Sequence, residues 1–394
     1  MEKKTLKDID VRKKRVLVRV DFNVPMKPDG TITDDTRIRA CLPTIQYLMS
    51  QQSRIVLCSH LGRPGGKVVE QLRLKPIAVR LSRLLGKPVG SLSDCIGPEV
   101  EGAVSELPEG GIILLENVRF HPEEEANDPV FARRLSALAD VYVDDAFGAC
   151  HRAHASIVGV THYLPAVSGL LLEKEIETLS RLMTNPERPL AVMIGGAKVA
   201  TKLGLLENIL PKADSLLIGG GMASTFLKSQ GFGVGASVVE KDKLGQVLKL
   251  LEKARFLGVK LLLPSDHVVA QSLDPHSASK TVPKESVPEG WVIADIGPKT
   301  IEAFSEELMK CREVFWNGPL GVFEVPKFAE GTQSIIRVIA NLKATTVIGG
   351  GSTAEAVVEM GLVDRMSYVS TGGGASLELL QGNVLPGVAA LQDK

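Results

Sequence analysis

Short apolar runs alternate with longer amphipathic stretches along the whole chain. In the first half, apolar runs predict strands at residues 15–22, 54–59, 111–116 and 140–145, and amphipathic spacing predicts helices at 37–49, 76–85 and 130–138. Runs this continuously apolar are typical of strands buried on both faces. Strands that alternate with helices form parallel sheets. The pattern therefore predicts an α/β fold.

The second half repeats this alternation with more glycine. Its predicted strands end in turns at 195–196, 219–221, 264–266, 295–298, 317–319, 349–351 and 371–374. Between the halves, residues 164–184 have a long helical pattern, with Pro165 and Gly169 near its start as hinge points. A chain of 394 residues is too long for one ordinary core. We therefore predict two domains joined by this helix.

Composition excludes several classes of function. Lys+Arg and Asp+Glu are 46 each, so the chain has no overall field that would attract nucleic acid or a membrane surface. Aromatic residues are only 4%, too few for a base-stacking platform. The five Cys are scattered, which favours reduced thiols and a cytoplasmic location. We find no signal segment or membrane span and expect a soluble protein without nucleic-acid or membrane partners.

Charged and polar residues follow each predicted strand of the first half. Asp21 and Asn23 follow the first strand, and Arg37 lies in the helix after it. The second strand is followed by His60, Gly62 and Arg63, the third by Arg119 and the fourth by Arg152. The carboxyl ends of parallel strands meet at one edge of a sheet, and Arg binds carboxylate and phosphate in a fork. These residues predict a site for a small, multiply charged anion. The alternative is solvated loop arginines paired with nearby acids.

Two other features of the sequence suggest ligands. Cys150, His151 and His154 lie close together, but no further Cys or His lies at ligand spacing, so we do not predict zinc there. Lys198 and Lys202 are four residues apart in what the pattern predicts as the first turn of a helix. A helix N-terminus already attracts anions, so this pair predicts a polyphosphate site. Two solvated surface lysines are the alternative.

Three triple-glycine turns at strand ends favour close backbone approach to nucleotide phosphates. Ser352 and Thr353 are expected to cap the helix that follows one of these turns. The G-x-x-x-x-G-K-[ST] pattern of P-loops is absent from the Lys198 turn. The fingerprint G-x-G-x-x-G does not follow the first strand of either half, which disfavours a dinucleotide site.

A series of motifs carries a specific resemblance. In order they are Arg19-Val-Asp-Phe-Asn-Val-Pro25, Ser59-His-Leu-Gly-Arg-Pro64, Leu115-Glu-Asn-Val-Arg-Phe120, Asp145-Ala-Phe-Gly, His151-Arg-Ala-His154, Gly195-Gly-Ala-Lys198, Asp295-Ile-Gly-Pro-Lys-Thr300, Trp316-Asn-Gly-Pro-Leu-Gly-Val-Phe-Glu324 and Ser370-Thr-Gly-Gly-Gly-Ala-Ser376. With these motifs the chain resembles the phosphoglycerate kinase family over its whole length. The resemblance implies reversible phosphoryl transfer in glycolysis, from 1,3-bisphosphoglycerate and MgADP to 3-phosphoglycerate and MgATP.

The resemblance also implies an architecture. It has two Rossmann-like domains, each a parallel sheet flanked by helices, facing each other across a cleft that closes during catalysis. Residues 1–168 plus 380–394 would form the phosphoglycerate-binding domain, 169–185 the hinge helix, and 186–379 the nucleotide-binding domain. The implied protein is a cytoplasmic monomer that uses Mg²⁺ with ATP or ADP.

Site residues follow from the matching motifs. Phosphoglycerate would be bound by Asp21, Phe22, Asn23, Arg37, His60, Leu61, Gly62, Arg63, Arg119 and Arg152. Nucleotide would be bound by Lys198, Lys202, Gly219, Gly220, Asn317, Glu324, Gly350, Gly351, Ser352 and Thr353. Arg37, Lys198, Lys202 and Gly373 would act on the transferring phosphoryl group.

One position departs from the family pattern. Family members commonly carry Asp, associated with magnesium, where this chain has Ser352. A hydroxyl is a poorer ligand for a hard dication than a carboxylate, so the protein ligand of magnesium stays open. The departure leaves one alternative, a non-catalytic protein that binds nucleotide or phosphoglycerate on the same fold.

Overall fold

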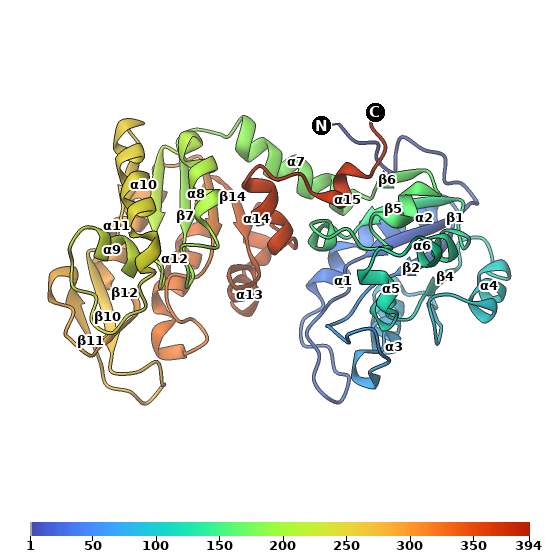
Figure 1. Cartoon of the computed structure of the whole chain (residues 1–394), viewed down its shortest axis with the longest axis horizontal. Coiled ribbons are helices and arrows are strands. Elements are labelled where there is room, and N and C mark those ends of the chain that lie inside the picture. Colours follow the sequence, from blue (N-terminus) through green and yellow to red (C-terminus); the bar gives the residue numbers. More distant parts are fainter. Residues whose placement is uncertain (1) are drawn as a thin grey trace. The chain divides into compact units, whose positions relative to one another are not determined.

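The computed structural model describes residues 2–394 and divides into two compact units (Figure 1). Unit 1 comprises Met1–Thr178 and Val384–Lys394, and unit 2 comprises Leu179–Asn383. The division falls within α7 (Leu170–Thr184), so this helix begins in unit 1 and ends in unit 2. No helix in the described part of the chain is long and apolar enough to cross a membrane.

Unit 1 is built on a six-stranded sheet whose paired strands are all parallel. In sheet order the strands are β3 (Gly90–Ser91), β4 (Ile112–Leu114), β2 (Arg54–Cys58), β1 (Arg15–Val20), β5 (Val141–Asp145) and β6 (Ala166–Ser168). The apolar runs that contain β4, β2, β1 and β5 were predicted as strands. The sequence pattern missed β3 and β6, of two and three residues, because neither lies in a longer apolar run. Residues 166–168 were wrongly included in the long helix.

The helices of unit 1 flank this sheet (Figure 1). They are α1 (Thr36–Ala40), α2 (Leu42–Ser50), α3 (Lys75–Leu85), α4 (Pro98–Ser105), α5 (Pro122–Glu125), α6 (Pro129–Ser136) and α15 (Pro386–Ala389), with 3₁₀ turns at Glu70–Leu72, Val118–Phe120, Phe147–Ala149 and Gly159–His162. The stretch predicted as one helix at 37–49 is two helices separated at Cys41. At α6, the Asp128 carboxylate caps the helix by accepting from the amides of Val130 and Phe131, both at 2.9 Å.

Apolar strand residues supply the core of unit 1. Val16 and Val18 of β1 are fully buried and pack with Ile45 of α2 and Ile77 of α3. Burial of one such side chain contributes roughly 1.5–3 kcal/mol, so the sheet is held rigidly where its strands end. This rigidity fixes the positions of the residues that follow each strand.

Unit 2 contains a second six-stranded parallel sheet. Its order is β15 (Tyr368–Val369), β14 (Thr345–Gly349), β13 (Glu313–Asn317), β7 (Leu190–Ile194), β8 (Ser215–Ile218) and β9 (Lys260–Leu262). Trp316 of β13 is fully buried and packs with Phe304 of α11 (Pro298–Leu308) and Ile335 of α12 (Glu330–Ile339), so aromatic and branched side chains form this core.

A three-stranded antiparallel sheet in unit 2 was not predicted. It consists of β11 (Ser279–Pro283), β10 (Asp266–Ala270) and β12 (Val292–Ile296). The run that ends at 295–298 was predicted as another strand of the parallel sheet, and this placement was wrong. The apolar run of β12 does not reveal its partners, because strand direction is set by contacts distant in sequence.

The helices of unit 2 flank its parallel sheet (Figure 1). They are α8 (Leu203–Ile209), α9 (Ala223–Ser229), α10 (Leu244–Phe256), α11 (Pro298–Leu308), α12 (Glu330–Ile339), α13 (Gly351–Glu359) and α14 (Gly374–Leu380), with 3₁₀ turns at Leu210–Lys212, Lys241–Lys243, Lys284–Ser286, Pro326–Phe328 and Val363–Arg365.

The last residues of the chain pack on unit 1. The Lys3 ammonium donates to the carbonyls of Ala389 at 3.0 Å and Leu391 at 2.7 Å. The Gly387 amide donates to the Cys150 carbonyl at 2.9 Å. The chain thus begins and ends in the same unit.

Strand order marks the place where each sheet can bind a ligand. In unit 1 the chain builds β2, β3 and β4 on one side of β1 and then returns to place β5 on its other side. In unit 2 the same reversal occurs between β7 and β13. Ligands of open α/β sheets bind beyond the carboxyl ends of the strands at such switch points.

Candidate active site

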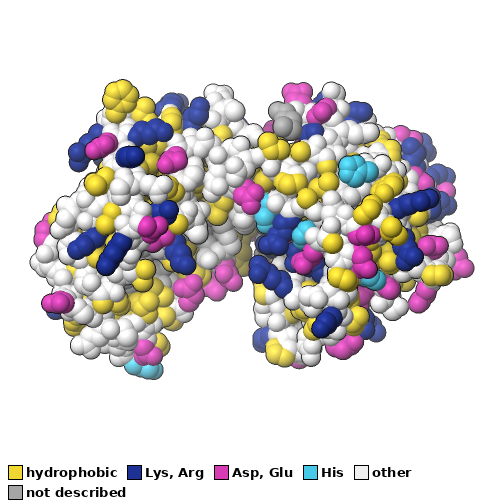
Figure 2. Space-filling view, in the orientation of Figure 1, with side chains coloured by type: hydrophobic (Ala, Val, Ile, Leu, Met, Phe, Trp, Pro, Cys, Tyr) yellow, Lys and Arg dark blue, Asp and Glu magenta, His cyan; other side chains and the backbone are white. Residues whose placement is uncertain are grey.

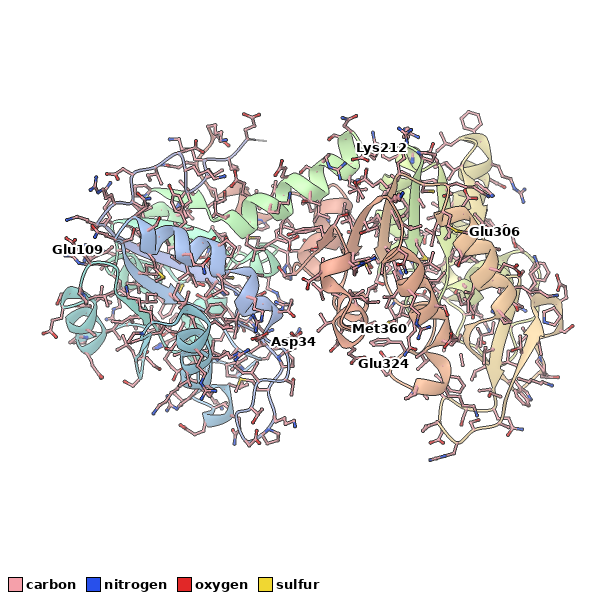
Figure 3. The ribbon with its side chains drawn as sticks, turned by 180° about the vertical axis from the view of Figure 1, so that it is seen from behind. Asp34, Glu109, Lys212, Glu306, Glu324 and Met360 are labelled. Atoms are coloured by element: carbon pink, nitrogen blue, oxygen red, sulfur yellow. The ribbon has the colours of Figure 1, made fainter. Side chains whose placement is uncertain are left out.

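An ion pair lies at the switch point of unit 1. Asp21 directly follows β1 and is 5% exposed, and the Arg37 guanidinium of α1 contacts its carboxylate. The Asp34 carboxylate (Figure 3) accepts from the Thr36 amide at 2.9 Å, which fixes the start of α1. Burial opposes ionisation of Asp21, but the charges of Arg37 and Arg19 and the hydrogen bond from the Asn23 amide lower its pKa below the ordinary value. The carboxylate therefore stays ionised and orients Arg37.

His60 is held in one protonation state by a buried arginine. Arg19 of β1 is 0% exposed and its guanidinium donates to Ser156 Oγ at 2.8 Å, to the Val20 carbonyl at 2.6 Å and to His60 Nδ1 at 3.2 Å. Arginine only donates, so Nδ1 must accept. Burial places the pKa of His60 well below its ordinary value. The ring is therefore neutral, with its proton on Nε2, and offers a hydrogen-bond donor.

Two asparagines order the loop after β2. The Asn23 side-chain oxygen accepts from the Gly62 amide at 2.9 Å. The Asn117 side chain, at the other side of the loop, accepts from the Leu61 amide at 3.2 Å and donates to the Leu61 carbonyl at 2.8 Å. The segment that carries Arg63 is therefore fixed from both sides.

The other arginines of unit 1 differ in their surroundings. Arg119 is 6% exposed, donates to the Gly62 carbonyl at 2.8 Å and lies 3.3 Å from a Glu125 oxygen. Arg152 is half-buried and contacts His151 Nε2 at 3.2 Å. Arg63 is exposed and has no hydrogen-bond or ion-pair partner within residues 2–394. Figure 2 shows Lys, Arg and His side chains gathered on the surface of this unit.

The predicted residues of unit 1 form two contact groups. Asp21, Arg37 and His60 form one group, and Asn23, Gly62 and Arg119 form the other. The side chains of Phe22 and Leu61 are 0% and 3% exposed and belong to the apolar core. These two residues can reach a ligand only through their backbone.

A pocket of about 330 Å³ lies at the switch point of unit 2. Its lining comprises Gly196, Lys202, Asn317, Gly318, Pro319, Gly350, Gly351, Ser352, Thr353, Gly373, Gly374 and Leu377. Both α13 and α14 begin at this pocket, so their unpaired N–H groups favour an anion there. Of the described residues, those that line the pocket include no Asp or Glu.

The two lysines of unit 2 have different environments, contrary to prediction. Residues 196–202 form turns, and α8 begins only at Leu203, so Lys198 and Lys202 do not share a helix face. Lys202 is 8% exposed, and its ammonium donates to the carbonyls of Gly195 at 2.7 Å and Asn317 at 2.9 Å. Burial lowers the pKa of Lys202 to about 8. Lys198 is exposed and does not line the pocket.

Lys202 keeps binding capacity despite these contacts. An ammonium group has three donor hydrogens, and the two carbonyls use two of them. One donor is left for an anion in the pocket. A bound anion would also favour the charged form of Lys202, which burial disfavours.

Asn317 supplies a second donor. It is 2% exposed, and its Nδ2 has no hydrogen-bond partner in the described part of the chain. A buried amide that is left unpaired costs about 1–3 kcal/mol. Because Asn317 lines the pocket, an acceptor oxygen of a ligand fits this atom.

The start of α13 differs from the expected cap. Gly350 with φ 88° is the N-cap, and no side chain caps this helix. Ser352 and Thr353 lie inside the first turn, so their predicted capping role was wrong. Thr353 Oγ1 instead accepts from the Gly318 amide at 2.6 Å, and it ties α13 to the turn after β13.

The glycine turns serve two purposes. A Cβ at Gly220 would lie 2.5 Å from the Gly196 amide, and one at Gly318 would lie 2.3 Å from the Gly195 carbonyl. These turns are glycine-rich because they pack on one another. At Gly373, with φ 51°, the space is open and only the backbone conformation requires glycine. The predicted close approach of the backbone to phosphate therefore fits best at the turns of residues 349–351 and 371–374.

Three predicted nucleotide residues besides Lys198 lie outside the pocket lining. Gly219 and Gly220 pack against the turn at Leu320, where the Gly220 amide donates to the Leu320 carbonyl at 3.0 Å. Glu324 is exposed in the loop between β13 and α12 (Figure 3). The pocket itself brings together Lys202, Asn317, Gly350, Gly351, Ser352, Thr353 and Gly373.

Comparison with known proteins identifies the family. A family model described as phosphoglycerate kinase matches residues 6–383. The chain belongs to the phosphoglycerate kinase family. It is 55% identical over 394 residues to the phosphoglycerate kinase of Moorella thermoacetica, with all of both chains covered. It is 56% identical over 400 residues to that of Synechococcus elongatus, again with all of both chains covered.

Solved phosphoglycerate kinases have the same fold. The structure from Coxiella burnetii is 40% identical, with a TM-score of 0.86, and 98% of each chain is covered. The structure from Pyrococcus horikoshii is 34% identical, with a TM-score of 0.87 and the same coverage. The predictions of the family, of the α/β fold and of an enzyme are confirmed.

The pocket lining was tested against the magnesium that the family implies. Mg²⁺ is usually held by one or two carboxylates together with substrate phosphates. The lining offers the Ser352 hydroxyl and the Asn317 amide oxygen but, within residues 2–394, no carboxylate. The residues therefore fit phosphate better than they fit a bare dication.

Two residues that order the candidate site of unit 1 were not predicted from the sequence. Arg19 received no role, although a charge inside the apolar run of β1 signals a buried partner. Asn117 lies within one of the quoted motifs but also received no role. Three hydrogen bonds of its side chain, to Leu61 and Leu72, join the loops after β2 and β4 and could not be inferred from spacing.

Proposed function

We propose that the Arg/His group of unit 1 binds phosphoglycerate and that the pocket of unit 2 binds the nucleotide. The chain is a phosphoglycerate kinase by family, and so a phosphotransferase with a carboxyl acceptor. The proposed reaction is 1,3-bisphosphoglycerate + MgADP ⇌ 3-phosphoglycerate + MgATP. Magnesium would bind together with the nucleotide phosphates and would neutralise part of their charge.

The reaction needs no general base. In the ATP-forming direction the nucleophile is an ADP phosphate oxygen, and in reverse it is the carboxylate of 3-phosphoglycerate. Both are already anionic, so no proton has to be removed. Catalysis then consists of in-line positioning and stabilisation of the charge on the transferring phosphoryl group.

Arg37, Lys202 and the Gly373 amide are proposed to stabilise that charge. The contact with Asp21 supports Arg37, because it holds the guanidinium in place before a ligand arrives. Burial supports Lys202, because a charge interacts more strongly where water is excluded. Lys198 is proposed to reach the phosphates from its exposed turn as a flexible counter-charge.

The remaining predicted residues are proposed to bind and orient. On the phosphoglycerate side, His60 would donate from Nε2, and Arg63, Arg119 and Arg152 would bind the substrate anion. On the nucleotide side, Gly219, Gly220 and Glu324 would contact adenine and ribose, and Gly350–Thr353 the phosphates. Because the two groups belong to different units, we propose that turnover depends on a closed state that excludes water.

The donor set of the unit 2 pocket carries this proposal. Lys202, the unpaired Asn317 amide and the starts of two helices all favour an anion, and the described lining contains no acid to oppose it. A coupled assay that follows consumption of MgATP with 3-phosphoglycerate tests the function. Turnover that depends on both substrates supports it. Nucleotide binding without turnover would instead favour a non-catalytic binding protein.

We also propose that the protein is a monomer. Sedimentation across a range of protein concentrations would test it. The cytoplasmic location stays a prediction, to be tested by fractionation of the source cells.

A further inference from the structure

Asp94, Cys95 and His121 form a cluster at one edge of the unit 1 sheet. Asp94 and Cys95 follow β3, and His121 follows the 3₁₀ turn after β4, at the side of the sheet away from the β1/β5 switch point. One ligand atom from each residue lies within 4.8 Å of the others. Within residues 2–394 this is the one group of His, Cys and acidic side chains close enough to share a metal ion.

The cluster combines an open side with a buried one. His121 Nε2 lies 2.7 Å from Asp94 Oδ1, and these side chains are 25% and 49% exposed. Cys95 is fully buried. An ion could therefore enter from solvent at Asp94 and His121 and meet the sulfur on the inner side.

Both backbone segments are fixed before any ion binds. The Leu92 amide donates to the Leu114 carbonyl, and the Glu116 amide donates to the Asp94 carbonyl, each at 3.2 Å. These bonds attach the Asp94–Cys95 segment to β4. The His121 ring packs on Phe131 with ring centroids 5.2 Å apart. Ligands on an ordered backbone lose little freedom on binding, which favours affinity.

The types of ligand atom in the cluster indicate which class of metal it would bind. Thiolate and imidazole bind zinc and similar transition metals, whereas magnesium and calcium prefer oxygen ligands alone. Three protein ligands leave a fourth position of a tetrahedral zinc ion for water. We propose that Asp94, Cys95 and His121 bind a divalent ion of the zinc class, at a site separate from the magnesium that accompanies the nucleotide.

Binding would have a structural consequence. The ion would join the segment after β3 to the turn after β4, which are otherwise linked here by hydrogen bonds and the Asp94–His121 pair. A ligand that binds the folded state alone raises the unfolding midpoint. The competing explanation is an ordinary Asp–His ion pair beside a buried, inert thiol.

Cobalt titration of the full chain tests the site. Co²⁺ bound to a thiolate gives a charge-transfer absorption band that other ligands do not produce. We expect this band to saturate at one ion per chain, to disappear when Zn²⁺ is added, and to persist in excess Mg²⁺. Zinc should also raise the thermal unfolding midpoint of the wild-type protein.

Variants assign the band to the cluster. Cys95→Ser should abolish it, and Cys311→Ser, a buried thiol of unit 2, should retain it. Since Cys95→Ser could disturb folding, Asp94→Asn and His121→Gln provide the decisive tests at partly exposed positions. Loss of a residue that hydrogen-bonds to a metal ligand typically weakens metal affinity about 10–100-fold. Asp94 and His121 are proposed as direct ligands, so the zinc affinity of each variant should fall at least about tenfold.

Three results would overturn the proposal. They are the absence of a saturable thiolate band in the wild type, a band that survives Cys95→Ser, and unchanged zinc affinity in both Asp94→Asn and His121→Gln. None of these depends on turnover, so the site can fail while the proposed kinase function stands.

Discussion

Nucleotide binding should draw a proton into the unit 2 pocket through Lys202. Burial lowers the pKa of this ammonium from 10.5 to about 8, which corresponds to about 3 kcal/mol against the charged form. Bound phosphates would offset that penalty and return the pKa toward its ordinary value. At about pH 9 the free enzyme would hold about 0.1 proton on Lys202 and the complex nearly one, so binding should take up about 0.9 proton.

The sign of the effect defines the pH dependence. Below about pH 7, Lys202 is already charged in the free enzyme, so little proton uptake is expected. Above about pH 8 the free enzyme loses this proton, and nucleotide affinity and the kcat/KM for MgATP should fall with an apparent pKa near 8.

Calorimetry measures the uptake directly. Nucleotide is titrated at about pH 9 in buffers with different ionisation enthalpies, and the slope of apparent against buffer enthalpy gives the number of protons. Lys202→Met should abolish the uptake, because it removes the buried ammonium. Lys198→Met should retain it, because that side chain is exposed. Equal uptake in wild type and Lys202→Met, or none in the wild type, would refute the reasoning.

Four further predictions follow. Arg37→Ala should lower turnover at least about 100-fold with an unchanged circular dichroism spectrum, and near-normal turnover would remove Arg37 from the chemistry. Arg19→Met should destabilise the fold in urea by about 3–5 kcal/mol, because Glu124 keeps a buried charge without its counter-ion, and adding Glu124→Gln should restore part of the loss. Burial raises the pKa of Asp145 from 3.8 to about 7, so the contribution of this one carboxyl group to stability should fall by up to about 4 kcal/mol as pH rises from about 4 to about 7. Asp145→Asn, measured by urea unfolding, should flatten this trend, and an unchanged slope would contradict it. Ser352→Asp should lower the free magnesium needed for half-maximal turnover, and an unchanged or higher requirement would exclude a metal-binding role at this position.

Apolar runs were enough to predict the longer strands of the parallel sheets, because these strands are apolar on both faces. The six residues of β1, for example, are all buried or half-buried. Polar residues at strand ends were equally informative, since Asp21, Asn23 and His60 all lie where their strands end. Short strands such as β3 and the antiparallel β10–β12 sheet have no distinct pattern and depend on distant contacts.

The details of the site were harder to infer. Lys198 and Lys202 are four residues apart in sequence, but their spacing did not reveal that α8 starts after both. The capping role expected for Ser352 was wrong because a glycine with positive φ takes the N-cap. Asn317 gained its importance from an unpaired amide, a property that only the packed structure defines.

The attachment of residues 384–394 to unit 1 has a consequence for biosynthesis. These residues are synthesised after all of unit 2, yet Lys3 and Cys150 bond to them. Unit 2 is a continuous segment, whereas unit 1 is complete only after unit 2 has been made. Domains generally fold during synthesis in N-to-C order. In this protein unit 1 would instead finish after unit 2, and its nascent form would need protection from aggregation until residues 384–394 have emerged.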